Sequence, residues 1–172
     1  LTSLMRDLYI PIPGHGENRF NAAYSYGGIS LLYQTVARNF GIRVDGYAIV
    51  DFAAFKDVIN AVGGVEIELT DAEYKYLTTA YAKTKGTVKE VNPGLNNMNG
   101  EQALAYTRIR QDAKADFGRT QRQRTVLQSI FTKVKAMAIG ELLKLAEEIL
   151  PSIATDLSNE EITSYIMTVL TM

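Results

Sequence analysis

Hydrophobic and polar positions in the first seventy residues switch between the period of a strand and the period of a helix. The expected elements are, in order, a strand over residues 4–10, a helix over 25–39, a β-prone run over 45–50, a helix after Asp51 and an alternating strand over 65–69. Pro11 to Gly14 are expected to end the first strand, and Gly41 the first helix. Asp51 has the side chain of a helix N-cap. Strands that alternate with helices in this way predict an α/β sheet.

The rest of the chain has mainly the pattern of helices. Residues 70–98 lose the periodicity and are interpreted as an excursion from the core, in which 88–91 is a candidate hairpin strand. The expected later elements are a helix opened by a capping box of Asn99 and Gln102, helices over 117–138 and 141–150, and a last helix opened by Ser158 and Glu161. We therefore expect one α/β domain over residues 1–172, with three α/β/α layers and a central mixed sheet flanked by helices.

Composition narrows the possible chemistry. The formal net charge is −1, which gives no support for general attraction to nucleic acid. The chain has no Cys and a single His, which excludes disulfides, thiolate metal sites and clusters of histidines. No run approaches the roughly 18 apolar residues of a membrane-spanning helix. Because the chain begins at Leu1 without an initiator Met, we expect a processed chain or an excised domain.

Five of the arginines lie between Arg108 and Arg124, and this cluster is the main candidate site. A run of charges is more often a solvated helix face. The core stripe of the long helix, however, is expected to consist of Leu127, Ile130, Val134 and Met137. Steps of three and four residues back along that stripe reach Gln123, Arg119 and Asp116, so the inward face becomes polar and charged at the start of the helix. Arg124 points elsewhere and is expected at the surface. A helix N-terminus favours anions, which predicts a cleft for a phosphate or pyrophosphate.

Arg108 and Arg110 stand two residues apart just before this helix. In an extended segment that spacing places both side chains on one face, and the planar guanidinium binds phosphate oxygens in pairs. The alternative is that both arginines pair with Asp112 and Asp116 and only hold the loop. Asp116 is also a candidate to orient the arginines or to act as a general base.

Arg6 and Asp7 form a second charged feature, inside a run suited to a buried strand. Two interpretations stay open. The pair is a structural ion pair, or Arg6 reaches the same anion as the cluster at 108–124.

Four sequence blocks resemble the LytR–CpsA–Psr family of cell-envelope proteins, in the order of that family. They are RDLYIPIPG (Arg6–Gly14), NAAYSYGG (Asn21–Gly28), DGYAIVDFAAFKDVINAVGGVEIEL (Asp45–Leu69) and LNNMNGEQALAYTRIRQDAKADFGRTQRQR (Leu95–Arg124). The resemblance extends over nearly the whole chain.

The resemblance implies a transferase on the extracytoplasmic face of the bacterial membrane. It would move a cell-wall glycopolymer, such as teichoic acid or capsule, from a polyprenyl-pyrophosphate carrier to a peptidoglycan hydroxyl, with Mg²⁺ neutralising charge. The phosphate-binding residues that the resemblance implies are Arg6, Arg108, Arg110, Arg119, Arg122 and Gln123. Arg119, Asp116 and Arg108 are the catalytic candidates, and Asp7 is expected to support Arg6.

The resemblance also implies that this chain begins after a strand, acidic metal ligands and a membrane anchor that family members carry upstream. The Mg²⁺ ligands are therefore not expected within residues 1–172. The alternatives are a polyprenyl-phosphate binding module without transfer activity, a pyrophosphatase that uses water as the acceptor, and, with least support, a transcriptional regulator or attenuator. No nucleic-acid partner is expected.

Overall fold

The computed structural model describes residues 2–82, 88, 90–109 and 115–171, and the side chains of 80, 115, 116 and 169–171 also lie outside the description. The chain divides into two compact units, residues 1–47 and 48–172. Each unit is described by itself below. The single domain expected over residues 1–172 stays a prediction.

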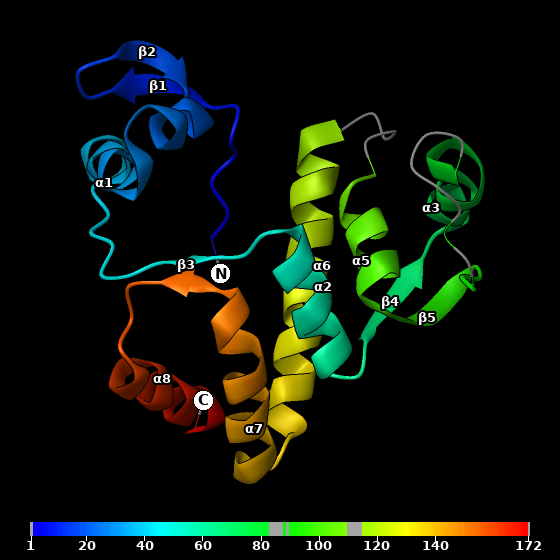
Figure 1. The fold of residues 1–172 in the computed structure, drawn as a ribbon. Helices are drawn as coiled ribbons and strands as arrows, with labels where there is room; N and C mark the ends of the chain where they lie inside the picture. Colours follow the sequence, from blue (N-terminus) through cyan, green and yellow to red (C-terminus); the bar gives the residue numbers. More distant parts are fainter. Residues whose placement is uncertain (1, 83–87, 89, 110–114, 172) are drawn as a thin grey trace. The chain divides into compact units, whose positions relative to one another are not determined.

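The first unit combines a hairpin with a long helix. Strands β1 (Tyr9–Ile12) and β2 (Gly16–Arg19) pair antiparallel, and helix α1 (Phe20–Phe40) follows directly (Figure 1). The segment Pro11–Gly14 ends the strand as expected, since β1 stops at Ile12, although Pro11 itself lies inside β1 opposite Glu17. A proline is tolerated there because a two-stranded ladder leaves one edge of each strand unpaired. The expected start at residue 4 is wrong, because β1 begins at Tyr9.

Helix α1 is kinked where the sequence predicts a helix to begin. Gly27 and Gly28 have non-helical backbone angles, and Gly28 has φ 60° and ψ −151°, a conformation that residues with a Cβ avoid. The helical segment beyond them corresponds to the one expected over 25–39. Gly41 ends the helix as expected, with φ 65° and its N–H donating to the Ala37 carbonyl at 3.0 Å.

The second unit is built around a two-stranded ladder. Strand β4 (Val65–Leu69) alternates buried and exposed positions as predicted, and it pairs antiparallel with β5 (Gly94–Met98). Between them lie α3 (Asp71–Lys75) and the π-helix η1 (Tyr76–Tyr81). The interpretation of 70–98 as an excursion is wrong for the described part, since Leu77, Val91 and Met98 are buried in the core. Residue 89 of the candidate hairpin strand lies outside the described residues, as do residues 83–87 before it.

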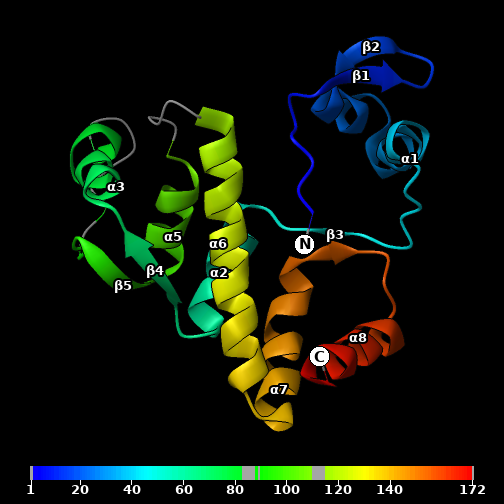
Figure 2. The same cartoon turned by 180° about the vertical axis from the view of Figure 1, so that it is seen from behind.

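Helices α5 (Gly100–Thr107) and α6 (Ala115–Ala136) pack against this ladder and against each other, and α2 (Phe52–Ala61) packs against α5 (Figures 1 and 2). The predicted caps are confirmed. Asp51 accepts a hydrogen bond from the Ala54 N–H at 2.8 Å, and Asn99 and Gln102 form the expected capping box. Phe52, the first residue of α2, is 61% exposed.

The chain ends in a further helical layer of the same unit. It consists of α7 (Ile139–Ile149), the 3₁₀ turn η2 (Leu150–Ser152), strand β6 (Ala154–Thr155) and α8 (Asn159–Thr171). Strand β3 (Ala48–Ile49) pairs with β6, a pairing that local periodicity did not predict. The Ser158–Glu161 capping box is confirmed, because Ser158 N–H donates to Glu161 and Glu161 N–H donates to Ser158.

The expected α/β class is confirmed, but the strand pairing differs from the expected central mixed sheet. The described strands form three two-stranded antiparallel ladders, β1–β2, β3–β6 and β4–β5. Alternation along a strand specifies its faces, whereas its partner depends on contacts distant in sequence, which accounts for the difference. In the part of the chain that the structure describes, no helix combines the length and the apolar character needed to cross a membrane.

The contact between α2 and α5 provides a test of the packing. A Cβ added to Gly100 would lie 2.6 Å from the Lys56 Cα, and the Gly100 N–H already donates to Asn60 at 2.8 Å. Gly100→Ala should therefore lower the free energy of unfolding by about 1–3 kcal/mol, the usual cost of overpacking. Gly140→Ala is the matched control, because a Cβ there meets nothing within 4 Å. It should raise stability by about 0.5–1 kcal/mol as a helical Gly-to-Ala change. Chemical denaturation measures both, and an equal response of the two variants would contradict the packing.

Candidate functional site

The buried face of α6 differs from the predicted stripe in the first half of the helix, whereas Ile130, Val134 and Met137 of that stripe pack against the hydrophobic clusters as predicted. Arg122 and Val126 are buried, while Leu127 is 39% exposed and Gln123 is exposed. The expectation that Gln123 lies on the inward face is therefore wrong. One residue corresponds to about 100° around a helix, so the error moves the charged part of the buried face from Gln123 to Arg122.

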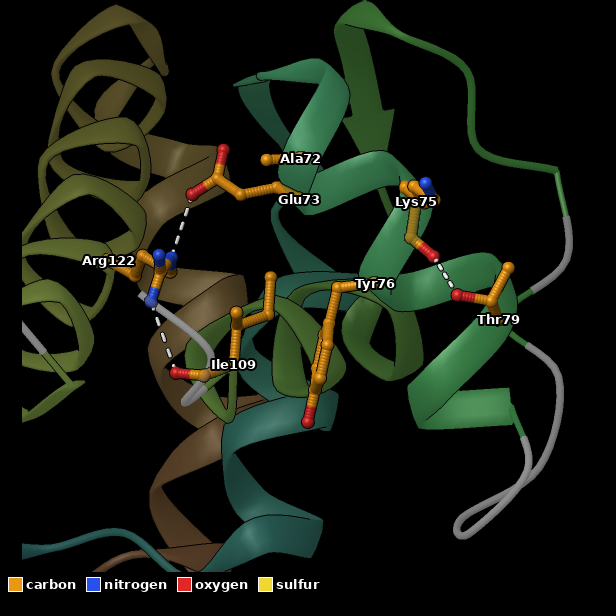
Figure 3. Close-up of a pocket in the computed structure, with 7 residues that line it drawn as sticks. All are labelled: Ala72, Glu73, Lys75, Tyr76, Thr79, Ile109 and Arg122. Atoms are coloured by element: carbon orange, nitrogen blue, oxygen red, sulfur yellow. Dashed lines mark hydrogen bonds and ion pairs between the residues drawn. The ribbon is translucent and has the colours of Figure 1, made fainter. Parts of the chain in front are cut away.

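Arg122 is held by two acceptors from different parts of the second unit. Its Nε donates to Glu73 Oε1 at 2.7 Å, and its Nη1 donates to the Ile109 carbonyl at 3.1 Å (Figure 3). The side chain of Arg122 is only 8% exposed and that of Glu73 only 14%. A buried cation requires such partners, because removing it from water is costly. Arg122 thus joins α6 to the start of α3 and to the end of α5.

Glu73 uses both of its carboxylate oxygens. Oε1 accepts from Arg122, while Oε2 accepts from the Thr70 N–H at 3.1 Å and from the Thr70 hydroxyl at 2.9 Å. Thr70 in turn accepts from the Glu73 N–H, which completes a capping box at the start of α3. The same carboxylate therefore fixes a helix end and neutralises the buried guanidinium.

Tyr106 lies beside this ion pair and is buried. Burial and then the negative charge of Glu73 raise the pKa of Tyr106 to about 12, against the opposing effects of Arg122 and a hydrogen bond with Thr125. The phenol is therefore neutral throughout the physiological range.

A pocket of about 260 Å³ opens beside the Glu73–Arg122 pair. It is lined by Ala72, Glu73, Lys75, Tyr76, Thr79, Ile109 and Arg122, and Figure 3 shows these side chains gathered from α3, η1, the end of α5 and α6. The side chain of Thr79 donates to the Lys75 carbonyl within its own helical segment.

Arg108 lies at the C-cap of α5, next to Ile109. Its guanidinium carbon stands 5.0 Å from the centre of the Phe52 ring, which places the planar group over the aromatic face. The side chain of Arg108 is half-buried, so part of it remains open to solvent.

The other members of the predicted cluster have different surroundings. Arg119 is half-buried in the early part of α6, and it makes polar contacts there. Arg124 was expected at the surface, which is wrong in part, since its Nε is buried and donates no hydrogen bond among the described residues. Arg110, and also the side chain of Asp116, lie outside the described residues. Phosphate binding by Arg108, Arg110, Arg119, Arg122 and Gln123 stays a prediction.

In the first unit, Asp7 is paired with two arginines. Arg6 Nε donates to Asp7 Oδ2 at 3.1 Å, and Arg19 Nη1 lies 3.8 Å from Asp7 Oδ1. The structural ion pair expected for Arg6 and Asp7 is thus present, and Arg19 is a member that the sequence reasoning missed. All three side chains retain solvent contact, and the role of Arg6 in anion binding stays a prediction.

The described residues do not form a Mg²⁺ site. Among the described ranges, no group of three or more His, Asp or Glu side chains lies close enough together to hold a metal ion. Glu73, the most buried carboxylate of the site, is already committed to Arg122 and Thr70. No residue described here is therefore assigned to a metal.

Glu73 is the site residue that sequence reasoning missed most clearly. A signal for it exists, because Thr70-Asp71-Ala72-Glu73 has the spacing of a capping box. That signal predicts the helix end and the Thr70 contact. It does not predict the pairing with Arg122, which lies 49 residues further along the chain.

The whole chain, residues 1–172, matches the LytR_cpsA_psr family, and the chain belongs to this family. Two curated relatives carry different descriptions. The polyisoprenyl-teichoic acid–peptidoglycan teichoic acid transferase TagU of Enterococcus faecalis is 34% identical over 164 residues, which cover 94% of this chain and 50% of TagU. The regulatory protein MsrR of Staphylococcus aureus is 36% identical over 132 residues, which cover 76% of this chain and 37% of MsrR.

Solved structures of a further relative, TagT of Bacillus subtilis, show a similar fold. TagT bound to LIIa-WTA superposes with a TM-score of 0.82 at 32% identity, covering 98% of this chain and 62% of TagT. TagT with bound octaprenyl pyrophosphate lipid superposes with a TM-score of 0.73 at 32% identity, covering 98% and 60%. The chain thus spans half or less of the curated relatives above and about three fifths of the solved ones.

The raised pKa of Tyr106 gives a test of the buried cluster. The folded protein keeps the Tyr106 proton to about pH 12, whereas an unfolded tyrosine loses it near 10. Between these values the folded state binds more protons, so the free energy of unfolding should fall as the pH rises through this window. Tyr106→Phe should remove that part of the pH dependence. An ultraviolet titration of both proteins checks this, and a Tyr106 that ionises with the ordinary tyrosines near pH 10 would contradict it.

Proposed function

We propose that this chain is the lipid-pyrophosphate-binding part of a cell-wall glycopolymer transferase. The polymer leaves a polyprenyl-pyrophosphate carrier and is joined to a hydroxyl of peptidoglycan. The observation that carries the proposal is the family match over residues 1–172, in a chain whose four family-like blocks include the arginine cluster. The named activity of TagU and the lipid in the TagT structure support the same substrate class.

Arg108 and Arg119 are the residues proposed to bind the pyrophosphate, with Arg110 joining them. Arg108 follows the end of α5, and Arg119 lies near the start of α6, the next described helix in the chain. Partial burial makes each guanidinium interact with an anion more strongly than a fully hydrated one would. Arg119 also lies within the first turns of a long helix, where unpaired N–H groups favour negative charge.

In the proposed reaction the acceptor hydroxyl attacks the phosphorus that carries the polymer, the one joined through the pyrophosphate bridge to the phosphate of the lipid carrier. The new bond joins acceptor and polymer, the bond to the carrier phosphate breaks, and the lipid phosphate leaves with the bonding electrons. The arginines stabilise the charge that builds up on this leaving phosphate. The hydroxyl proton is accepted by a carboxylate, for which Asp116 is the candidate. Holding the two substrates together supplies a further part of the rate.

The cellular setting forms part of the same proposal. The protein acts at the extracytoplasmic face of the bacterial membrane, held there by a membrane anchor and meeting peptidoglycan as the acceptor. A divalent cation is expected from the family, with ligands outside this chain, and none of the steps above depends on it. Nucleic acid is not among the proposed partners.

Arg119→Ala tests the proposed substrate. It should weaken binding of octaprenyl pyrophosphate roughly ten- to hundredfold, the loss expected when one charged hydrogen-bonding group is removed. Lys135→Ala is the matched control, since Lys135 is an exposed cation near the other end of the same helix. Calorimetry of the purified variants measures the affinity, and circular dichroism checks the fold. Wild-type affinity in folded Arg119→Ala would contradict the proposal.

The products separate the transferase from its alternatives. Incubation with a lipid-pyrophosphate-linked glycan and peptidoglycan fragments should give a polymer–peptidoglycan adduct and the lipid monophosphate. Release of phosphate-linked products without an adduct would show that water is the acceptor, as in a pyrophosphatase. Binding without any product would show a binding module.

A further inference from the structure

The Arg122 guanidinium is already paired with a buried carboxylate. Glu73 Oε1 lies 2.7 Å from its Nε, and the Ile109 carbonyl accepts from its Nη1 at 3.1 Å. A phosphate that bound Arg122 would have to displace a buried carboxylate or share the cation with it. Either arrangement brings two anions together in a poorly hydrated place, which is unfavourable. The geometry therefore points away from direct phosphate contact by Arg122.

Ile109 is the position through which Arg122 can act on the neighbouring arginines. Its side chain is 2% exposed and belongs to the core, and its N–H donates to the Tyr106 carbonyl at 3.3 Å. The hydrogen bond from Arg122 to the Ile109 carbonyl fixes the other polar backbone group of Ile109. In the sequence Ile109 stands between Arg108 and Arg110, so the direction in which the chain leaves α5 is set at this point.

Glu73 in turn fixes the direction of Arg122. Its carboxylate is held by Thr70 at the start of α3, which restricts its movement with the guanidinium. The resulting series of contacts runs from Thr70 through Glu73 and Arg122 to the Ile109 carbonyl. Each member lies in the second unit and is partly or fully buried, apart from Thr70, which is exposed.

We propose that Glu73 and Arg122 are positioning residues that hold the Arg108–Ile109 turn in the geometry needed to bind the anion. The proposal rests on the proposed function, because it takes Arg108 as a ligand of the lipid pyrophosphate. Arg122 then has a positioning role in place of direct phosphate binding, and Glu73 shares that positioning role. The pair acts by fixing the backbone at Ile109, and the two residues do not touch the substrate.

The direction in which Glu73→Gln changes the affinity for octaprenyl pyrophosphate tests the proposal. The change keeps the size of the side chain but removes the charge that orients Arg122. If Arg122 positions Ile109, affinity for octaprenyl pyrophosphate should fall by about tenfold or more, since misplacement of a group by roughly 1 Å is enough for a loss of that order. If Arg122 itself binds the phosphate, freeing it from a competing carboxylate should leave the affinity unchanged or increase it. That outcome would overturn the proposal.

Val126→Ala is the control for a general loss of stability. Val126 is fully buried one turn further along α6 and makes no part of the ion pair. The variant should unfold more easily, yet bind with an affinity within about twofold of wild type, since the polar contacts to Ile109 are intact. An equal loss of affinity in Val126→Ala and Glu73→Gln, at equal loss of stability, would show a merely structural role.

A double replacement keeps the test decisive where Glu73→Gln does not fold. Glu73→Leu with Arg122→Met removes both charges and restores the stability that either single change loses, because no unpaired charge is left buried. Affinity should stay low, since no group then holds the Ile109 carbonyl. Recovery of both stability and affinity would overturn the proposal. Wild-type protein that does not bind the probe, or Arg119→Ala that binds it normally, would instead contradict the proposed function.

Discussion

The buried charge of Arg122 is the constraint on which the arrangement of the second unit depends. Removing one partner from such a pair typically costs about 3–5 kcal/mol, because the other is left charged and poorly hydrated. The segments that supply the partners must therefore meet: the start of α3 brings Glu73, and the end of α5 brings the Ile109 carbonyl. The β4–β5 ladder, which brackets α3 in the sequence, packs with α5 and α6 in one hydrophobic core.

This arrangement divides the arginines of one sequence cluster into two kinds. Arg122 is enclosed and neutralised, and it connects three elements. Arg108 and Arg119 are half-buried, with Arg108 resting on the face of Phe52. A half-buried guanidinium is restricted in its orientation and partly open to solvent, which suits recognition of a phosphate. This division supports phosphate binding by Arg108 and Arg119 and a positioning role for Arg122. The solved relatives of this family include a structure with a bound lipid pyrophosphate.

Local chemistry predicted the features that depend on neighbouring residues. The Asp51 and Asn99 caps, the Gly41 terminator and the alternating strand at 65–69 are all present. Features that depend on distant residues were not predictable in the same way. Strand β5 and the β3–β6 pair need partners from elsewhere in the chain. On α6, Leu127 was expected to be buried but is exposed, whereas Arg122 is buried. The burial of Arg122 is made possible by Glu73, a distant residue that helical periodicity does not reveal.

A structure of the protein with octaprenyl pyrophosphate would test the central claim most directly, through the distances from the phosphate oxygens to each arginine. The account predicts phosphate oxygens within hydrogen-bonding distance of Arg108 and Arg119, with Arg122 still paired with Glu73 and still donating to the Ile109 carbonyl. A phosphate bound to Arg122, with the Glu73 pair broken, would contradict it. So would a pyrophosphate bound away from all three arginines.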